Sequence, residues 1–240
     1  MQKNLIFQSK IKTDLFEYLK RNQKRNILSF LNQHDLYQFN KEKAFSESLT
    51  NDYNLNFIDG FTISLYLSIL NFKRTPRIRG PTFTRDFLTD KKLSGNKKHF
   101  FIVPDKNDLI EIKKKFPYFK KVSGYNPSYI KGIEFSEEEI EKISKLLNKE
   151  KPDFVWIGIA SPKQNILSKR LFEKTNVQYF VNIGAALDFL LGKKEEAPLI
   201  IRELGIEWLY RLITDFKYTR KKVWRSFIGL KYLKGIKLEI

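Results

Sequence analysis

Short apolar runs alternate with amphipathic helical patterns along most of the chain. The runs predict strands over Asn26–Leu31, Asn54–Ile58, residues 99–103, Lys121–Tyr125, residues 154–159 and a segment beginning near residue 177. Between them, helical spacing predicts helices such as Phe61–Leu70, and Ser136 with Glu139 forms a capping box that opens another. Strands that alternate with helices indicate the α/β class, with a Rossmann-like parallel or mixed sheet flanked by helices.

Residues 177–192 predict a strand, a tight turn and a helix in immediate succession. The turn is formed by Gly184, Ala185 and Ala186, and the helix that follows contains Asp188 and ends at Gly192. Small residues allow a ligand to approach the backbone, and a helix N-terminus favours a phosphate or diphosphate. Close packing of the helix on the sheet would explain the same small residues.

Composition narrows the class of protein. The 240 residues are 42% apolar and include 21 Phe, which suffices for a buried core. There is no cysteine and only two histidines, so disulfides, thiolate metal sites and histidine-rich metal centres are not expected. No signal-peptide core is evident, and the longest apolar run is too short to span a bilayer. We therefore expect a cytoplasmic protein that needs no metal or other cofactor.

The net charge of +18 indicates an anionic partner, which could be nucleic acid, acidic lipid or a phosphorylated substrate. The charge is concentrated after Phe216, where eight basic residues and no acidic ones alternate with aromatic residues up to Lys237. This pattern predicts a core domain over residues 1–215 and a basic, amphipathic, membrane-binding segment over residues 216–240. An RNA-binding tail and a solvated helix docked on the core are the alternatives. The candidate membrane residues are Lys221, Lys222, Trp224, Arg225, Lys231 and Lys234.

Polar residues follow several of the predicted strands, where open α/β sheets bind their ligands. The motifs of dinucleotide-binding, P-loop and serine-hydrolase proteins are absent. The remaining polar set fits a nucleotide-diphosphate site with one carboxylate free to act as a general base. Its members are Asn32, Gln33, Asp59, Arg77, Gln164 and Asp188.

Several short motifs together resemble the WecG/TagA/CpsF glycosyltransferases, glycosyltransferase family 26, over roughly residues 26–220. The most specific is Gly205-Ile-Glu207-Trp-Leu-Tyr-Arg211-Leu, downstream of Gly184-Ala-Ala-Leu-Asp188-Phe. The weaker ones are Asp59-Gly60, Arg77-x-x-Gly80, Pro162-Lys163-Gln164 and Ala197-Pro198.

The resemblance implies a metal-independent, inverting transfer of a sugar from a UDP-sugar to a polyprenyl-diphosphate-linked saccharide, at the cytoplasmic face of a bacterial plasma membrane. It makes Asp59 the catalytic base and places Gln164 near the donor, with Asn32 or Gln33 at the end of the first strand. The donor-binding set also includes Arg77, Gly184, Ala185, Asp188 and Glu207. The cations expected to close over the diphosphate are Arg211, Lys217 and Arg220.

Several positions depart from the family pattern, and the threonine that often precedes the Asn of the first strand has no counterpart, since Phe30 and Leu31 are apolar. Asn165 replaces a Glu, Thr82 an Asp, Glu196 an Arg and Ala160 a Gly. These departures affect the expected donor sugar more than the reaction type. They also permit a non-catalytic member that scaffolds a membrane assembly, and the basic charge permits a nucleic-acid-binding protein, although nucleic acid is not the expected partner. The sequence leaves a homo-oligomer open.

Overall fold

The protein forms a parallel six-stranded sheet in the order β3-β2-β7-β6-β4-β5. The computed structural model describes residues 5–9, 12–21 and 24–239. The strands are β2 (Asn26–Leu31), β3 (Asn54–Ile58), β4 (Lys98–Ile102), β5 (Lys121–Tyr125), β6 (Phe154–Ile157) and β7 (Tyr179–Asn182). All neighbouring pairs are parallel, so the predicted Rossmann-like α/β class is confirmed.

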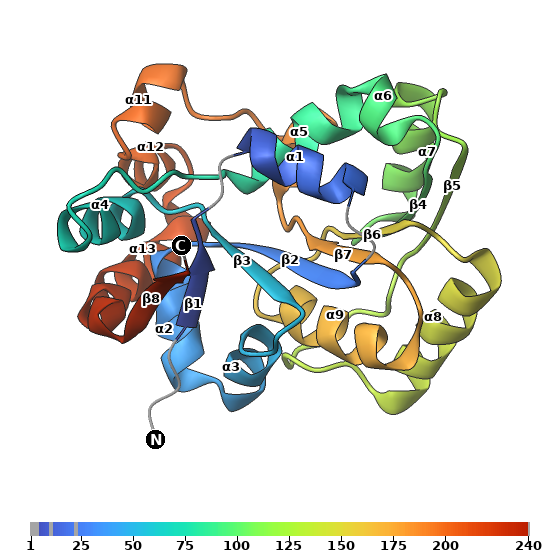
Figure 1. Ribbon diagram of the computed structural model, residues 1–240, viewed down its shortest axis with the longest axis horizontal. Coiled ribbons are helices and arrows are strands. Elements are labelled where there is room, and N and C mark those ends of the chain that lie inside the picture. Colours follow the sequence, from blue (N-terminus) through green and yellow to red (C-terminus); the bar gives the residue numbers. More distant parts are fainter. Residues whose placement is uncertain (1–4, 10–11, 22–23, 240) are drawn as a thin grey trace.

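Helices cover both faces of this sheet (Figure 1). One face carries α1 (Lys12–Arg21), α5 (Gly80–Thr89), α6 (Lys91–Ser94), α7 (Lys106–Lys115) and α10 (Ala186–Leu190). The other carries α8 (Glu137–Glu150) and α9 (Lys163–Lys174).

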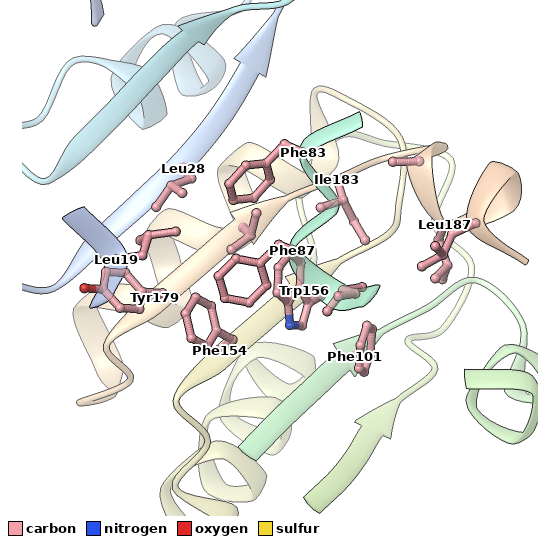
Figure 2. Packing of buried hydrophobic residues seen from close by; sticks show 14 of the residues in the cluster. Leu19, Leu28, Phe83, Phe87, Phe101, Phe154, Trp156, Tyr179, Ile183 and Leu187 are labelled. Atoms are coloured by element: carbon pink, nitrogen blue, oxygen red, sulfur yellow. The ribbon is translucent and has the colours of Figure 1, made fainter. Parts of the chain in front are cut away.

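Side chains alternate along the strands between these two layers. On β6, Phe154 and Trp156 join the first cluster, whereas Val155 and Ile157 join the second. In the first cluster, Phe87 of α5 packs against Phe154 with ring centroids 4.9 Å apart (Figure 2). The sheet is therefore buried on both faces, and the residues at the carboxyl ends of its strands are attached to a rigid element.

A third apolar cluster lies beyond the β3 edge of the sheet and involves both ends of the chain. There β1 (Leu5–Gln8) pairs in parallel with β8 (Ile236–Glu239). Packed around this pair are α2 (Gln33–Lys41), α3 (Lys43–Leu49) and α4 (Phe61–Leu70). The remaining elements are α11 (Leu199–Glu203), α12 (Glu207–Thr214), α13 (Phe216–Gly229) and the 3-10 helix η1 (Leu230–Gly235).

The predicted boundary at residue 215 falls between α12 and α13. A Cβ atom on Gly229 of α13 would lie only 2.0 Å from the backbone oxygen of Gln33 on α2, so the two helices are in close contact. Together with the β1–β8 pair, this contact holds residues 216–239 against the core.

Helix caps differ from the sequence prediction at two places. Ser136 does cap α8, but the Glu139 carboxylate accepts hydrogen bonds from the Ser128 N–H and the Tyr125 hydroxyl, so the capping box is not formed. The pair Ser161-Pro162 also predicts an N-cap and a first turn for α9. Ser161 does not cap this helix, because its hydroxyl donates to Asp35 at 2.8 Å. In both cases the side chain that a local sequence pattern predicts as a helix cap is instead hydrogen-bonded to residues outside that helix.

Candidate active site

The carboxyl ends of the central strands meet at one edge of the sheet. Leu31 of β2 lies opposite Ile58 of β3, and Asn182 of β7 lies opposite Ile157 of β6. The residues that follow these strands therefore share that edge. They are Asn32, Asp59, Gly184 and, in the first turn of α9, Gln164.

Asp59 follows β3 directly, and its backbone N–H donates to the Leu31 carbonyl at 2.9 Å. Its side chain is half-buried. Burial raises the pKa of Asp59 to about 6; Arg79 and Arg77 oppose this rise, whereas Glu207 and Asp35 add to it. Such a carboxyl is mostly ionised at neutral pH and is a stronger base than an ordinary aspartate. Asp59 therefore has the properties that a general base requires.

The residues beside Asp59 explain the glycine that follows it. A Cβ atom on Gly60 would lie 2.6 Å from Gln33 Oε1 and 3.2 Å from Asn32 Cα, so a larger residue would displace the Gln33 side chain and crowd the Asn32 backbone. Asn32 caps α2, because its Oδ1 accepts the His34 N–H at 2.9 Å. Of the two candidates at the end of β2, Gln33 thus packs on the Asp59 turn and Asn32 begins the helix.

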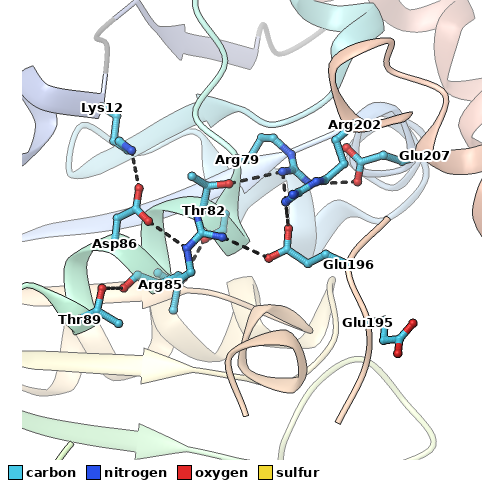
Figure 3. A network of polar contacts seen from close by, with 12 residues as sticks. Lys12, Arg79, Thr82, Arg85, Asp86, Thr89, Glu195, Glu196, Arg202 and Glu207 are labelled. Atoms are coloured by element: carbon cyan, nitrogen blue, oxygen red, sulfur yellow. Dashed lines mark hydrogen bonds and ion pairs between the residues drawn. The ribbon is translucent and has the colours of Figure 1, made fainter. Parts of the chain in front are cut away.

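Two arginines from the segment between α4 and α5 flank Asp59. Arg77 Nε donates to the Asp59 carbonyl at 3.0 Å, which fixes this arginine to the turn that carries the carboxylate. Glu207 of α12 then bridges both arginines, with its oxygens 3.0 Å from Arg79 and 3.8 Å from Arg77. Figure 3 shows the Arg79–Glu207 contact. Glu207 thus lies beside the predicted base, and its role in donor binding stays a prediction.

Glu196 lies among three arginines (Figure 3). It accepts a hydrogen bond from Arg202, and its oxygens lie 3.7 Å from Arg79 and 3.6 Å from Arg85. Thr82 Oγ1 is 3.4 Å from the same Arg79 nitrogen. Two of the positions that depart from the expected family pattern therefore meet at one guanidinium, and only Glu196 brings a carboxylate to it.

Gln164 and Gly184 are in direct contact. Gln164 Oε1 accepts the Gly184 N–H at 2.8 Å, and Gly184 has a φ of 50°, which favours glycine. The helix behind this turn, α10, has only five residues, and the carboxylate of its Asp188 pairs with Lys194. Ala185 is exposed. The Gly184 N–H of the predicted phosphate-binding turn is therefore already hydrogen-bonded to Gln164, a residue that the sequence predicts in the same site.

Asn165 belongs to the core behind Gln164. It is 1% exposed, and its Nδ2 donates to Ser29 Oγ at 3.1 Å. Asn182 Nδ2 donates to the same hydroxyl at 3.0 Å. The departure at position 165 therefore changes a buried hydrogen-bond network rather than the surface of the site.

The three predicted closing cations occupy different environments. Arg211 of α12 donates to the Glu195 carbonyl at 2.8 Å, and its guanidinium lies 5.1 Å from the centre of the Phe189 ring. It therefore joins α12 to the segment after α10. Lys217 and Arg220 are exposed on α13 and form no ion pair among the described residues.

Large apolar side chains are exposed mainly on α4, α11, α12 and α13. Of the seventeen large hydrophobic residues that are exposed in the described part of the chain, these helices and their connections carry fourteen, and Phe72 is 98% exposed. We call this set the apolar surface: Leu65, Ile69, Leu70, Phe72, Leu199, Ile200, Leu204, Ile206, Trp208, Leu209, Ile213, Phe216, Trp224 and Phe227. The four helices lie at the same end of the molecule (Figure 1).

Of the predicted membrane residues, Trp224 belongs to this surface, and the cations lie on α13 and η1. On α13, Lys221, Lys222, Trp224 and Arg225 are exposed while Val223 is buried against the core, and Lys231 and Lys234 are exposed on η1. Within the described ranges, no helix combines the length and the apolar character needed to cross a bilayer. The amphipathic division of α13 is present, and its binding to lipid stays a prediction.

Sequence reasoning missed the roles of Glu196 and Arg202 and the apolar faces of α4, α11 and α12. In the sequence, Glu196 follows Lys193, Lys194 and Glu195 and looks like part of a solvated charged loop. The apolar face of α12 carried a signal, because Trp208, Leu209 and Ile213 recur at helical spacing. From the sequence alone, the same spacing is equally compatible with a helix face that is buried in the core.

Comparison with known proteins places this geometry in a family. The sequence profile described as the Glycosyl transferase WecG/TagA/CpsF family matches residues 7–233. A protein of Staphylococcus aureus (strain NCTC 8325 / PS 47) is 35% identical over 88 residues. It is named N-acetylglucosaminyldiphosphoundecaprenol N-acetyl-beta-D-mannosaminyltransferase. A protein of the same name from strain MRSA252 is 33% identical over 79 residues.

These matches to individual proteins are partial. They cover 35% and 33% of this chain, and the chain spans 32% and 31% of the length of the two relatives.

Proposed function

This chain belongs to the WecG/TagA/CpsF glycosyltransferase family, and we propose that it is an inverting glycosyltransferase that acts in cell-surface polysaccharide biosynthesis. Its donor is a UDP-sugar, and its acceptor is a saccharide linked to a polyprenyl diphosphate. The names of the relatives support an N-acetylhexosamine as the transferred sugar and N-acetylglucosaminyl-diphosphoundecaprenol as the kind of acceptor. The observation that carries the proposal is Asp59, a half-buried carboxyl of raised pKa at the ligand-binding edge of the sheet.

The proposed reaction needs one base. Asp59 takes the proton of the acceptor hydroxyl while that oxygen bonds to the anomeric carbon from the face opposite UDP. The bond from the anomeric carbon to UDP breaks, and its electron pair leaves with the diphosphate. Inversion follows from this single displacement, and no second carboxylate is required.

The negative charge that grows on UDP requires cations or N–H donors close to the diphosphate. We assign this role to Arg211, Lys217, Arg220 and the Gly184 turn. Lys217 and Arg220 have no acidic partner among the described residues and are free to meet a ligand. Arg211 is already fixed to the segment that follows α10. Asn32, Gln33, Arg77, Gln164, Ala185 and Asp188 then line the donor side of the site.

A lipid-linked acceptor requires the enzyme to work at a membrane surface. The apolar surface and the bordering cations of α13 support peripheral attachment to the inner face of the plasma membrane, because lipid headgroups attract the cations and apolar side chains enter the interface. Each Lys or Arg near an anionic surface contributes about 1 kcal/mol of attraction. A nucleic-acid surface would use the same cations but would leave the exposed apolar side chains without a role.

The test is a transfer assay with the purified full chain. A panel of UDP-sugars, beginning with UDP-N-acetylmannosamine, is offered with a short-chain N-acetylglucosaminyl diphosphate lipid, and UDP release is measured. We expect one donor to support release that depends on the acceptor. Absence of acceptor-dependent release with every donor would overturn the proposal.

A further inference from the structure

Helix α12 is docked beside Asp59 through two contacts. At its start, Gly205 has a φ of 72° and lies so close to Phe61 that a Cβ atom would be 2.2 Å from the ring. The same ring lies 5.7 Å below the Arg77 guanidinium. Two residues later, the Glu207 carboxylate bridges Arg77 and Arg79. A displacement of α12 would therefore also separate Glu207 from Arg77 and Arg79.

Four charged groups face Asp59, and they come from three parts of the fold. Arg77 and Arg79 belong to the segment before α5, Glu207 to α12 and Asp35 to α2. Both arginines would stabilise an ionised Asp59, and each would weaken it as a base. Glu207 reduces this effect in two ways, because it is a negative charge and because it occupies the guanidinium groups.

We propose that Glu207 is a positioning residue whose docking on Arg77 and Arg79 keeps these arginines from neutralising Asp59, so that the base is competent only while α12 is in place. This inference rests on the proposed function only in assigning Asp59 the role of base. The charge coupling itself is a property of the folded chain. It gives Glu207 a function in the chemistry although its side chain does not need to touch the reacting atoms.

The raised pKa of Asp59 is consistent with this arrangement, since Glu207 is among the groups that raise it. Replacing Glu207 by Gln keeps the size and a hydrogen-bond acceptor for Arg79 but removes the charge. Replacing Gly205 by Ala leaves every charge in place but forces the start of α12 away from Phe61. The two variants thus test the charge and the docking separately.

The primary measurement is the pH titration of the Asp59 carboxyl by ¹³C NMR in the full chain, with Asp59→Asn used to assign the signal. In the wild type we expect a midpoint near pH 6. In Glu207→Gln the midpoint should fall by about one pH unit or more, because two nearby cations lose their partner. Gly205→Ala should lower it too. Glu203→Gln, an exposed glutamate without an ion pair among the described residues, should leave it unchanged.

A second readout is the acid limb of the pH–rate profile for transfer, which should move down in Glu207→Gln by the same amount as the NMR midpoint. An unchanged midpoint in folded Glu207→Gln would overturn the inference, and transfer that still depends on Asp59 would then leave the proposed function standing. A lowered midpoint in a chain that transfers no sugar would have the opposite meaning. The coupling would stand and the proposed function would fall.

Discussion

At the scale of single residues, the ionisation of Asp59 affects both the proposed catalysis and the stability of the fold. Burial raises its pKa to about 6, above the ordinary value near 3.8. Because the folded pKa is higher than the unfolded one, this group favours folding at low pH, and that contribution is lost as the pH rises through 6. At neutral pH the ionised carboxylate is therefore a cost to the fold, which suits a functional group better than a structural one.

We predict that Asp59→Asn raises the free energy of unfolding at pH 7 by roughly 1–3 kcal/mol, since the amide carries no charge to desolvate. The gain should shrink as the pH falls and largely vanish below about pH 4. Urea denaturation at both pH values measures it, with Asp52→Asn, an exposed aspartate, as the control. A variant less stable than the wild type at pH 7 would mean that the arginines stabilise the Asp59 carboxylate more than burial destabilises it.

Arginines and lysines take the place of a metal in the proposed reaction. The only histidines of the chain are His34 and His99, and among the described residues no three His, Asp or Glu side chains form a metal-binding group. We predict that excess EDTA leaves the rate of UDP release unchanged. The measurement compares rates before and after chelation, and a loss of activity that Mn²⁺ restores would refute a metal-independent mechanism.

The candidate residues could be predicted from the sequence where a local pattern fixes their place. Asp59 ends a strand and precedes glycine, and Gln164 lies in the first turn of a helix after a strand. The pKa of Asp59 could not be predicted, because the charges around it come from α12 and from the segment before α5. The ion pairs of Glu196 could not be predicted for the same reason, since Arg79 and Arg85 are distant from it in the chain.

At the scale of elements, predictions were accurate where both ends of a segment carry local signals. β3 and α4 have the predicted bounds, because Asp59 and Gly60 separate a buried strand from an apolar helix. After β2 the sequence predicts one helix that continues through Ala44 and Phe45, but the structure has two helices that meet at Glu42. Two prolines and a glycine predict a loop over residues 76–81, but Gly80 and Pro81 open α5, because proline fits the first turn of a helix, where its missing N–H is not needed.

Strand β8 was not predicted, and its partner explains why. Its four residues pair with β1 at the other end of the chain, and no local pattern reveals such a contact. The C-terminal segment consequently has two roles. Its buried residues, such as Val223 and Ile236, attach it to the core, while its charged residues remain exposed.

We predict that Gly229→Ala destabilises the protein by about 1–3 kcal/mol, because the new methyl group would meet the backbone of α2, which cannot move aside cheaply. Gly132→Ala is the matched control, since nothing lies within 4 Å of a Cβ atom at that position. Urea denaturation of the two variants measures the difference. Equal stability would show that α13 is not held tightly against α2.

At the scale of the whole molecule, charge and exposed apolar area are unevenly distributed. The apolar surface and the cations of α13 lie at one end, and α7, whose last turn carries three exposed lysines, lies at the other (Figure 1). This asymmetry allows a test in which the same number of cations is removed at two places, one beside the apolar surface and one distant from it.

We predict that changing Lys221, Lys222 and Arg225 to Gln strongly weakens sedimentation with liposomes that contain anionic lipid. Three cations at about 1 kcal/mol each correspond to roughly a hundredfold loss of affinity at low salt. Changing Lys113, Lys114 and Lys115 of α7 to Gln removes the same charge and should have little effect. Equal losses in both triple variants would indicate attraction by net charge alone, and no loss in either would rule out the membrane role of α13.

Asp59 is the base in the proposed sugar transfer, and the decisive measurement of this role is acceptor-dependent UDP release by Asp59→Asn. The assay uses the donor that the wild type accepts and a short-chain lipid-diphosphate acceptor, and UDP binding is measured in parallel. We predict that the variant folds, binds UDP with wild-type affinity and loses nearly all transfer, because an amide cannot accept the proton of the acceptor hydroxyl. Transfer at the wild-type rate would show that Asp59 only shapes the turn after β3 and would contradict the account.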